Sequence, residues 1–139
     1  IFIKDNNKRN VIAHLFDSFS YSNKENFDEL LDKSLKMGVN PNDVIVGNNN
    51  LIHLACEKTS NFLVKKAISL DQEMNLKNDN GLTPLHLAAM KSKDDKVLKT
   101  LIEGGADTAL LTDFDETVYD LAKENEFLIA NKVNIEFLK

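Results

Sequence analysis

Histidine and cysteine are the residue types of this sequence with the strongest capacity for metal binding or nucleophilic catalysis. His14, His53 and His86 stand at matching places in similar stretches, and the single cysteine, Cys56, follows His53 by three residues. Imidazoles can ligate zinc, and a thiolate beside a histidine can act as a nucleophile. Neither arrangement is complete, because no second cysteine or carboxylate stands at ligand spacing and nothing orients a Cys–His pair. We therefore expect no catalytic residue, no metal ligand and no cofactor, and the protein is not expected to be an enzyme.

Glycines and acidic residues offer two further candidate sites. The five glycines do not form a phosphate-binding loop and instead fit turns and helix ends. Asp113, Asp115, Glu116 and Asp120 lie close together, but they lack the ligand spacing and the internal glycine of a calcium-binding loop. The pattern therefore favours a solvated acidic loop tip over a calcium site.

The composition restricts the partners and the cellular setting of the protein. The chain has 139 residues, enough for one ordinary domain, and its 42% hydrophobic and 28% charged residues are typical of globular proteins. The 17 basic and 22 acidic residues give a net charge of −5, which disfavours binding to nucleic acid or to an anionic membrane. No apolar run approaches the roughly 20 residues that span a bilayer, and a single cysteine fits a reducing compartment. We expect an intracellular monomer, cytoplasmic or nuclear.

The stretch at residues 78–107 contains the signals of a turn followed by two helices. Asn80-Gly81 marks a tight turn, Thr83 can cap a helix, and Pro84 fits the first helical position. Gly105 supplies a left-handed stop after the second helix. The apolar positions expected to face inward from the two helices are Leu85, Ala88, Ala89, Val97, Leu98, Leu101 and Ile102.

This pattern is repeated along the chain. Upstream, His53 precedes His86 by 33 residues, and Asp71 stands where the later copy has Gly105. Aspartate tolerates the left-handed conformation better than most residues with a side chain, so Asp71 can end a helix in the same way. The outer copies are weaker: Thr117 follows the capping threonine by 34 residues, and the first copy has its two helices at residues 11–16 and 27–36 with a polar insertion between them.

The third copy resembles the ankyrin repeat, through the run Thr83-Pro84-Leu85-His86-Leu87-Ala88 and the ending Gly104-Gly105-Ala106-Asp107. The resemblance implies an all-α fold, an ankyrin-repeat solenoid of about four stacked helix-turn-helix repeats with short β-hairpin loops. It implies a structural role for the histidines, which would form hydrogen bonds near the turns. One domain over residues 1–139 is expected, because a single repeat cannot bury its own apolar face. We place the repeats at about 8–44, 45–77, 78–111 and 112–139, the outer two being degenerate capping repeats.

Ankyrin repeats usually bind proteins on their concave side, which consists of the hairpin tips and the exposed faces of the first helices. The resemblance therefore implies a protein-protein interaction module that recruits, scaffolds or inhibits another protein. Carried over residue by residue, the candidate binding residues of the third and fourth repeats are Lys77, Asp79, Asn80, Leu82, Met90, Lys91, Asp113, Phe114 and Glu116. Further candidates in the second and fourth repeats are Ile45, Val46, Gly47, Asn49, Glu57, Lys58, Leu111, Glu124 and Asn125.

Two residues allow more than one interpretation. Leu82, Met90 and Phe114 are apolar residues within the candidate binding set, and Phe114 stands at a hairpin tip, which is normally polar. Phe114 therefore either anchors a partner or packs beneath the C-terminal helices. Asn75 stands where some ankyrin repeats carry a hydroxylated asparagine. We prefer the alternative, in which its side chain bonds locally and stabilises the loop.

An alternative function is a substrate-recruiting or regulatory region of a larger enzyme. The sequence starts at Ile1 without an initiator methionine and stops at Lys139 inside an apolar, helix-like stretch, as a fragment would. In that case a catalytic domain would lie outside this chain.

Overall fold

The computed structural model describes residues 11–41 and 46–139, and all regular structure in these residues is helical. The prediction of an all-α fold is confirmed. Three short 3-10 turns accompany the helices: η1 (Tyr21–Asn23), η2 (Val46–Asn48) and η3 (Glu136–Leu138). The eight α-helices are α1 (Val11–Asp17), α2 (Lys24–Lys36), α3 (Leu51–Glu57), α4 (Asn61–Ser69), α5 (Pro84–Lys91), α6 (Lys96–Glu103), α7 (Val118–Lys123) and α8 (Glu126–Ala130).

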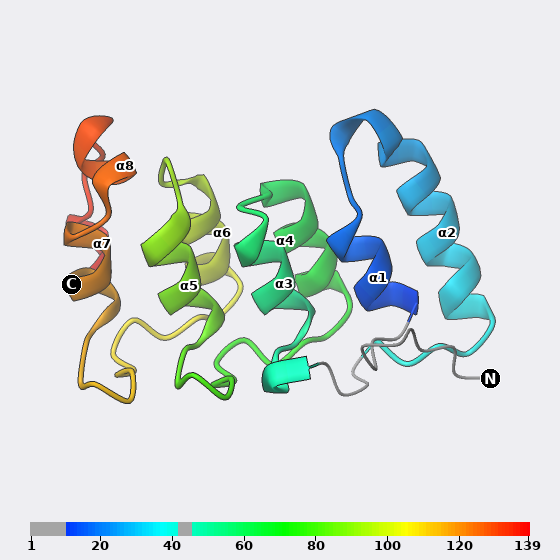
Figure 1. Cartoon of the computed structure of the whole chain (residues 1–139), viewed down its shortest axis with the longest axis horizontal. Coiled ribbons are helices and arrows are strands. Elements are labelled where there is room, and N and C mark those ends of the chain that lie inside the picture. Colours follow the sequence, from blue (N-terminus) through cyan, green and yellow to red (C-terminus); the bar gives the residue numbers. More distant parts are fainter. Residues whose placement is uncertain (1–10, 42–45) are drawn as a thin grey trace.

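The helices form consecutive pairs that stack side by side, from α1 and α2 at one end to α7 and α8 at the other (Figure 1). In this view α4 and α6 lie behind α3 and α5, and the loops that lead from one pair to the next all project to the same side of the stack. We refer to α5–α6 as the third repeat and to α7–α8 as the fourth. This arrangement is the predicted solenoid.

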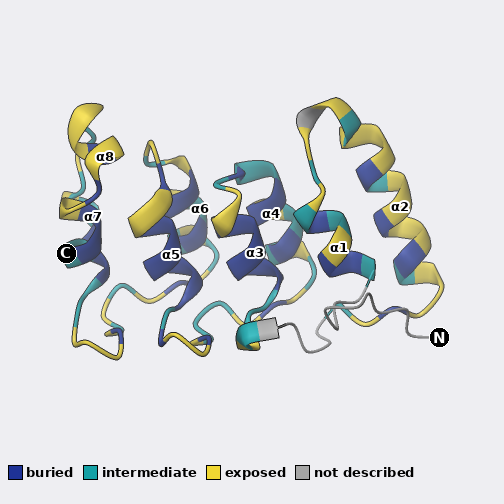
Figure 2. Cartoon of the chain, viewed as in Figure 1, coloured by how far each residue is buried: buried dark blue, intermediate teal, exposed yellow. Residues whose placement is uncertain are grey.

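Small buried residues bring the first helices of neighbouring repeats together. Ala55, Ala88 and Ala122, on α3, α5 and α7, are each 0% exposed. Because an alanine side chain is a single methyl group, α3 packs closely on α5 and α5 on α7. The buried residues line the stack from end to end, whereas the outer side of α2 is largely exposed (Figure 2).

The first helices of three repeats begin with the same reciprocal cap. At α5, the Thr83 hydroxyl accepts a hydrogen bond from the His86 backbone N–H at 3.3 Å, and His86 Nδ1 accepts one from the Thr83 backbone N–H at 3.2 Å. Two N–H groups that a helix start leaves unpaired are thereby satisfied, and Pro84 follows at the first position, as predicted. Equivalent pairs cap α3 (Asn50 and His53) and α7 (Thr117 and Asp120).

Left-handed residues end the second helices, as the sequence predicts. Gly105 has a φ of 107° after α6, and Asp71 has a φ of 63° after α4. After α6 the Ala106 N–H donates to the Leu101 carbonyl at 3.0 Å, and the Gly105 N–H donates to the Ile102 carbonyl at 3.1 Å. These two bonds satisfy carbonyl groups that the helix itself leaves free and turn the chain towards the next loop.

The loops differ from the expected β-hairpins, because no described residue lies in a strand. Two backbone bonds close each tip. Asn78 N–H donates to the Leu82 carbonyl and Thr112 N–H to the Glu116 carbonyl, both at 2.9 Å, while the Asn78 and Thr112 carbonyls accept from the Gly81 and Asp115 N–H groups. The side-chain oxygens of Asn78 and Thr112 accept two further backbone N–H groups within their own tips. Hydrogen bonds from side chains to the backbone thus replace the ladder of backbone hydrogen bonds that would define a pair of β-strands.

The second helix of the first repeat starts earlier than predicted. α2 begins at Lys24 rather than at residue 27, and η1 precedes it within the stretch assigned to an insertion. Ser20 and Asn23 explain the difference, since the Asn23 side chain accepts a hydrogen bond from the Ser20 N–H at 3.0 Å. These polar residues begin a helical turn before the apolar stripe of α2 is reached.

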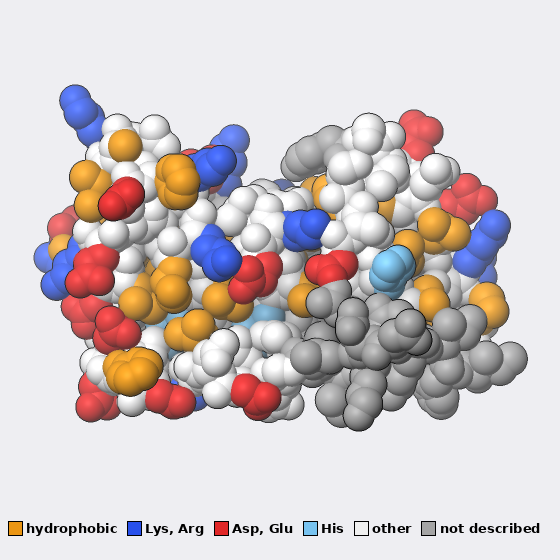
Figure 3. Space-filling view, in the orientation of Figure 1, with side chains coloured by type: hydrophobic (Ala, Val, Ile, Leu, Met, Phe, Trp, Pro, Cys, Tyr) orange, Lys and Arg blue, Asp and Glu red, His pale blue; other side chains and the backbone are white. Residues whose placement is uncertain are grey.

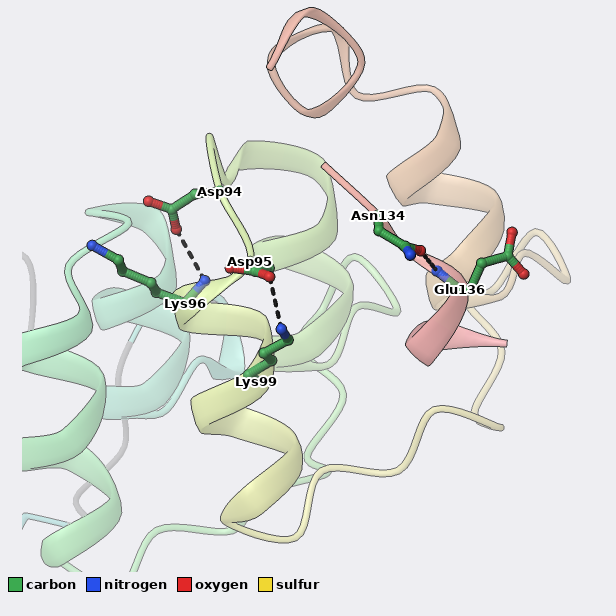
Figure 4. A network of polar contacts seen from close by, with 6 residues as sticks. All are labelled: Asp94, Asp95, Lys96, Lys99, Asn134 and Glu136. Carbon is green, nitrogen blue, oxygen red and sulfur yellow. Dashed lines mark hydrogen bonds and ion pairs between the residues drawn. The ribbon is translucent and has the colours of Figure 1, made fainter. Parts of the chain in front are cut away.

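Local charges fix the start of α6 (Figure 4). Asp94 Oδ1 accepts a hydrogen bond from the Lys96 backbone N–H at 3.0 Å, and Asp95 Oδ2 lies 2.8 Å from Lys99 Nζ. The hydrogen bond from Lys99 is the main cause that lowers the pKa of Asp95. Carboxylates are favourable beside the unpaired N–H groups of a helix start.

Within the described part of the chain, no helix has both the length and the apolar character needed to cross a membrane.

Candidate protein-binding surface

The buried His53 connects the second repeat to the third, and the buried His86 holds the segment that leads to the fourth loop tip. His53 Nε2 lies 2.9 Å from the Leu82 carbonyl oxygen, and His86 Nε2 lies 3.0 Å from the Leu110 carbonyl oxygen. A carbonyl can only accept, so Nε2 carries the proton, and Nδ1 is free to accept the N–H of the cap. Both side chains are 0% exposed, and burial lowers the pKa of each imidazole, so both are neutral. The structural role expected for these two histidines is confirmed.

His14 and Cys56 do not form a reactive site. His14 is exposed on α1, whereas His53 and His86 are buried. Cys56 is buried, and this burial raises the pKa of its thiol, which keeps the sulfur protonated and unreactive. Among residues 11–41 and 46–139, no group of three His, Cys, Asp or Glu side chains is arranged to hold a metal ion.

The loop tips of neighbouring repeats pack directly on one another. The Asp79 backbone N–H donates to the Gly47 carbonyl at 2.8 Å, which joins the second tip to the third. Gly81, with a φ of 76°, faces the fourth tip, and a Cβ at this position would overlap the Asp113 carboxylate. Only a glycine therefore allows the Asp113 side chain to lie against the backbone of the third tip.

The side chain of Asn75 forms hydrogen bonds with the next repeat rather than within its own loop. Its Oδ1 accepts the Asp107 backbone N–H at 2.8 Å, and its Nδ2 donates to the Gly105 carbonyl at 3.3 Å. The expected local role is corrected accordingly: the side chain stabilises the contact between two repeats.

A groove of about 530 Å³ opens between the third and fourth repeats, where the loop tips meet α5 and α7. This volume lies in the range of roughly 300–1,000 Å³ that is usual for ligand pockets. Figure 3 shows hydrophobic side chains gathered over α5, α7 and the neighbouring tips, with acidic side chains around them. The groove is lined by Asp79, Asn80, Leu82, Met90, Asp113, Phe114, Glu116 and Leu121, of which all but Leu121 are candidates from the sequence.

The apolar part of the groove is open to solvent. Phe114 is 82% exposed and Met90 is 45% exposed, while Leu82 is partly buried and Leu121 is 9% exposed. The alternative in which Phe114 packs beneath the C-terminal helices is therefore wrong. Leu121 was missed because it aligns with Leu87, 34 residues earlier, a position assigned neither to the inward-facing stripe nor to the binding face.

The rim of the groove is acidic. Asp79, Asp113 and Glu116 are the charged residues that line it, and no described Lys or Arg forms an ion pair with any of the three. Lys77 and Lys91, although candidates from the sequence, do not line the groove. Lys91 Nζ instead lies 2.7 Å from Glu57 Oε2, which joins the ends of α5 and α3.

Among the described candidates of the second repeat, Asn49 and Gly47 are engaged in contacts between loop tips. Ile45 and the side chain of Val46 lie outside the described residues. Asn49 is engaged within the tips, since its Oδ1 accepts a hydrogen bond from Asn78 Nδ2 at 2.9 Å, and Gly47 binds the third tip as described above.

Asn125 is not available to a partner. Its side chain is 5% exposed, and its Nδ2 donates to the carbonyls of Ala89 and Ser92 at 2.9 and 2.8 Å. It therefore joins α8 to the third repeat, which corrects its assignment as a candidate binding residue. Leu111 is 40% exposed and Glu124 is also exposed, but neither lines the groove.

Comparison with known proteins agrees with this architecture. A family model of ankyrin repeats, containing three copies, matches residues 13–132. A search of curated proteins found no match. The matched region spans most of the chain and contains α2 to α8, including the three capped first helices and the left-handed helix ends. The chain therefore belongs to the ankyrin-repeat family.

Proposed function

We propose that this chain is a protein-interaction module that binds a partner protein in the groove between the third and fourth repeats. Ankyrin repeats are generally protein-protein interaction modules. The observation that carries the proposal is the exposure of Phe114, 82%, and of Met90, 45%, beside one groove. Exposed aromatic and methionine side chains within a polar rim are typical of the energetically important centre of an interface.

The residue types in the groove support binding rather than catalysis. Its lining contains no histidine, cysteine, serine or lysine, so it lacks a hydroxyl, thiol or amine nucleophile paired with an adjacent histidine base. We therefore propose a non-catalytic role in recruitment, scaffolding or inhibition. The proposal includes a monomer that works inside the cell without nucleic acid, which the net charge of −5 and the buried, unpaired Cys56 support.

A pair of matched triple variants tests the groove. Leu82→Ser/Met90→Ser/Phe114→Ser removes its apolar side chains. Leu30→Ser/Met37→Ser/Phe127→Ser serves as the control, because these residues are 46%, 57% and 53% exposed but do not line the groove. Wild type and both variants would be immobilised and used to capture proteins from a lysate of the cells that express the chain, followed by mass spectrometry. Circular dichroism confirms beforehand that each variant is folded.

We expect a protein that wild type and the control variant capture equally and that the groove variant loses. Binding of the isolated partner would then be measured by calorimetry, where loss of two or three anchor side chains weakens affinity by about 100-fold or more. Equal capture by all three proteins would refute the groove as the binding site. No capture by any of them would contradict the proposed interaction module.

A further inference from the structure

We infer that the partner presents an arginine side chain to the groove, with its aliphatic stem on the apolar floor and its guanidinium at the acidic rim. The inference rests on the proposed function, because it assigns the chemistry of the partner at the same groove. It follows from three features of the groove: its charge, its apolar floor and the uncovered ring of Phe114.

The charge of the rim selects a cation. Asp79 and Asp113 come from neighbouring tips, and Glu116 stands at the base of the fourth tip, so that three carboxylates surround one groove of about 530 Å³. The bare backbone of Gly81 brings the Asp113 carboxylate against the third tip. Because the Debye length is about 10 Å at 0.1 M salt, these carboxylates act together on a bound side chain. An acidic segment would be repelled, and a purely apolar one would leave the carboxylates without partners.

Phe114 differs from other accessible phenylalanines of the chain. Phe62, Phe127 and Phe137 each have a lysine ammonium over the ring, with Nζ 4.8–5.3 Å from the centroid for Lys24, Lys93 and Lys99, respectively. Within the described residues, no Lys or Arg of the chain occupies the same place over Phe114, although it is the most exposed of the large hydrophobic side chains. A cation supplied by a partner would give Phe114 the same interaction.

Arginine fits these three features better than lysine does. Its planar guanidinium can bind carboxylates through two parallel hydrogen bonds and can stack on an aromatic face, whereas an ammonium is a more strongly hydrated point charge. The methylene stem would cover Leu82 and Met90, in the way that long charged side chains bury their apolar part while the charge stays at the surface.

A displayed library of random twelve-residue peptides supplies the probe. Peptides selected on the wild-type chain would be sequenced, and the strongest binder would be labelled with fluorescein for anisotropy titrations. In that peptide each arginine would be replaced in turn by citrulline, its neutral isostere, and by lysine. The rim variant is Asp79→Asn/Asp113→Asn/Glu116→Gln, which leaves the apolar floor intact. The control variant, Glu25→Gln/Glu29→Gln/Asp32→Asn, removes the same charge from exposed positions on α2.

We expect selected peptides to share an arginine. Citrulline at that position and the rim variant should each weaken binding about tenfold, lysine should weaken it less, and the control variant should change it less than twofold. Raising the salt from about 0.1 M to about 1 M should weaken binding to wild type and have less effect on the rim variant.

The opposite outcomes are distinct. In one outcome, the selected peptides lack arginine, bind the rim variant as well as wild type, and do not bind the Leu82→Ser/Met90→Ser/Phe114→Ser variant. That outcome would overturn the arginine inference and leave the proposed function intact. Peptides that bind all variants equally would refute the groove, and with it both proposals. A selection that yields no binding peptide would also overturn the arginine inference, whereas the proposed function would still be decided by the capture of a folded partner.

Discussion

Mild acid should destabilise this protein through His53 and His86. Both imidazoles are buried, donate from Nε2 to a backbone carbonyl distant in the sequence and have a lowered pKa because of burial. The pKa of an unfolded histidine is about 6.5. Since the folded-state pKa lies below that value, the unfolded chain binds more protons between the two pKa values. The free energy of unfolding is therefore fully retained above pH ~6.5 and falls as the pH drops through this window.

The magnitude follows from the two sites. Between pH ~7.5 and ~5.5, a histidine that remains neutral in the folded state costs about 1.4 kcal/mol of stability, so two of them cost at most about 2.7 kcal/mol. That is a large part of the roughly 5–15 kcal/mol that stabilises a small domain. The carboxyls of Asp95 and Asp120, whose pKa values are lowered by hydrogen bonds from Lys99 and from Thr117, lose their contribution only at lower pH, below about 4.

Urea unfolding followed by circular dichroism at several pH values measures this effect. The variant His86→Asn should show about half of the wild-type loss, because asparagine does not titrate. The variant Leu30→Ser is the control and should keep the full loss, since Leu30 is 46% exposed and does not titrate. If His86→Asn does not fold, NMR titration of the imidazole signals of wild type gives the same answer. Stability that does not change between pH ~7.5 and ~5.5, or an ordinary pKa for both buried imidazoles, would refute the reasoning.

Three further changes have definite expected outcomes. Gly81→Ala should lower the free energy of unfolding by about 1–3 kcal/mol, because φ is 76° and the new methyl group overlaps the Asp113 carboxylate; Asp113→Ala in addition should restore only part of the loss in urea unfolding. Asn75→Ala should cost about 1–2 kcal/mol by the same assay, since it removes two hydrogen bonds to the next repeat, and no loss would contradict that role. Cys56 is 0% exposed, so an aromatic disulfide reagent should modify it only after unfolding, and rapid reaction of the native protein would show otherwise.

The sequence predicts the parts of the fold in which a particular backbone conformation is adopted by only a few residue types. Thr83 and Pro84 marked the start of a helix, and Gly105 and Asp71 marked left-handed stops, because few residues adopt these conformations at low cost. The spacing of His53 from the next histidine gave the period. Each of these signals is local in the sequence, so no knowledge of the tertiary structure was needed.

Contacts between repeats could not be predicted in the same way. Lys91 pairs with Glu57, and Asn125 holds two carbonyls of the third repeat, so both side chains are engaged at positions that the family pattern left open to a partner. Leu121 could not be recognised as part of the groove, since apolar periodicity does not distinguish a buried side chain from the floor of a groove. The partner with which a charged side chain forms an ion pair depends on distances in the folded structure, and the sequence does not give those distances.

The bonds from His53 to the Leu82 carbonyl and from Asn125 to the Ala89 and Ser92 carbonyls join the second, third and fourth repeats and should make their unfolding cooperative. In a linear array, each unit is coupled only to its nearest neighbours, and the strength of that coupling decides how many units melt together. The outer side of α2 is largely exposed at one end of the stack, so α1 and α2 should fray before the rest and exchange their amide hydrogens first. The segment from α3 to α7 should open as one unit. A ligand held between the third and fourth repeats would then protect amides in α3, which it never touches.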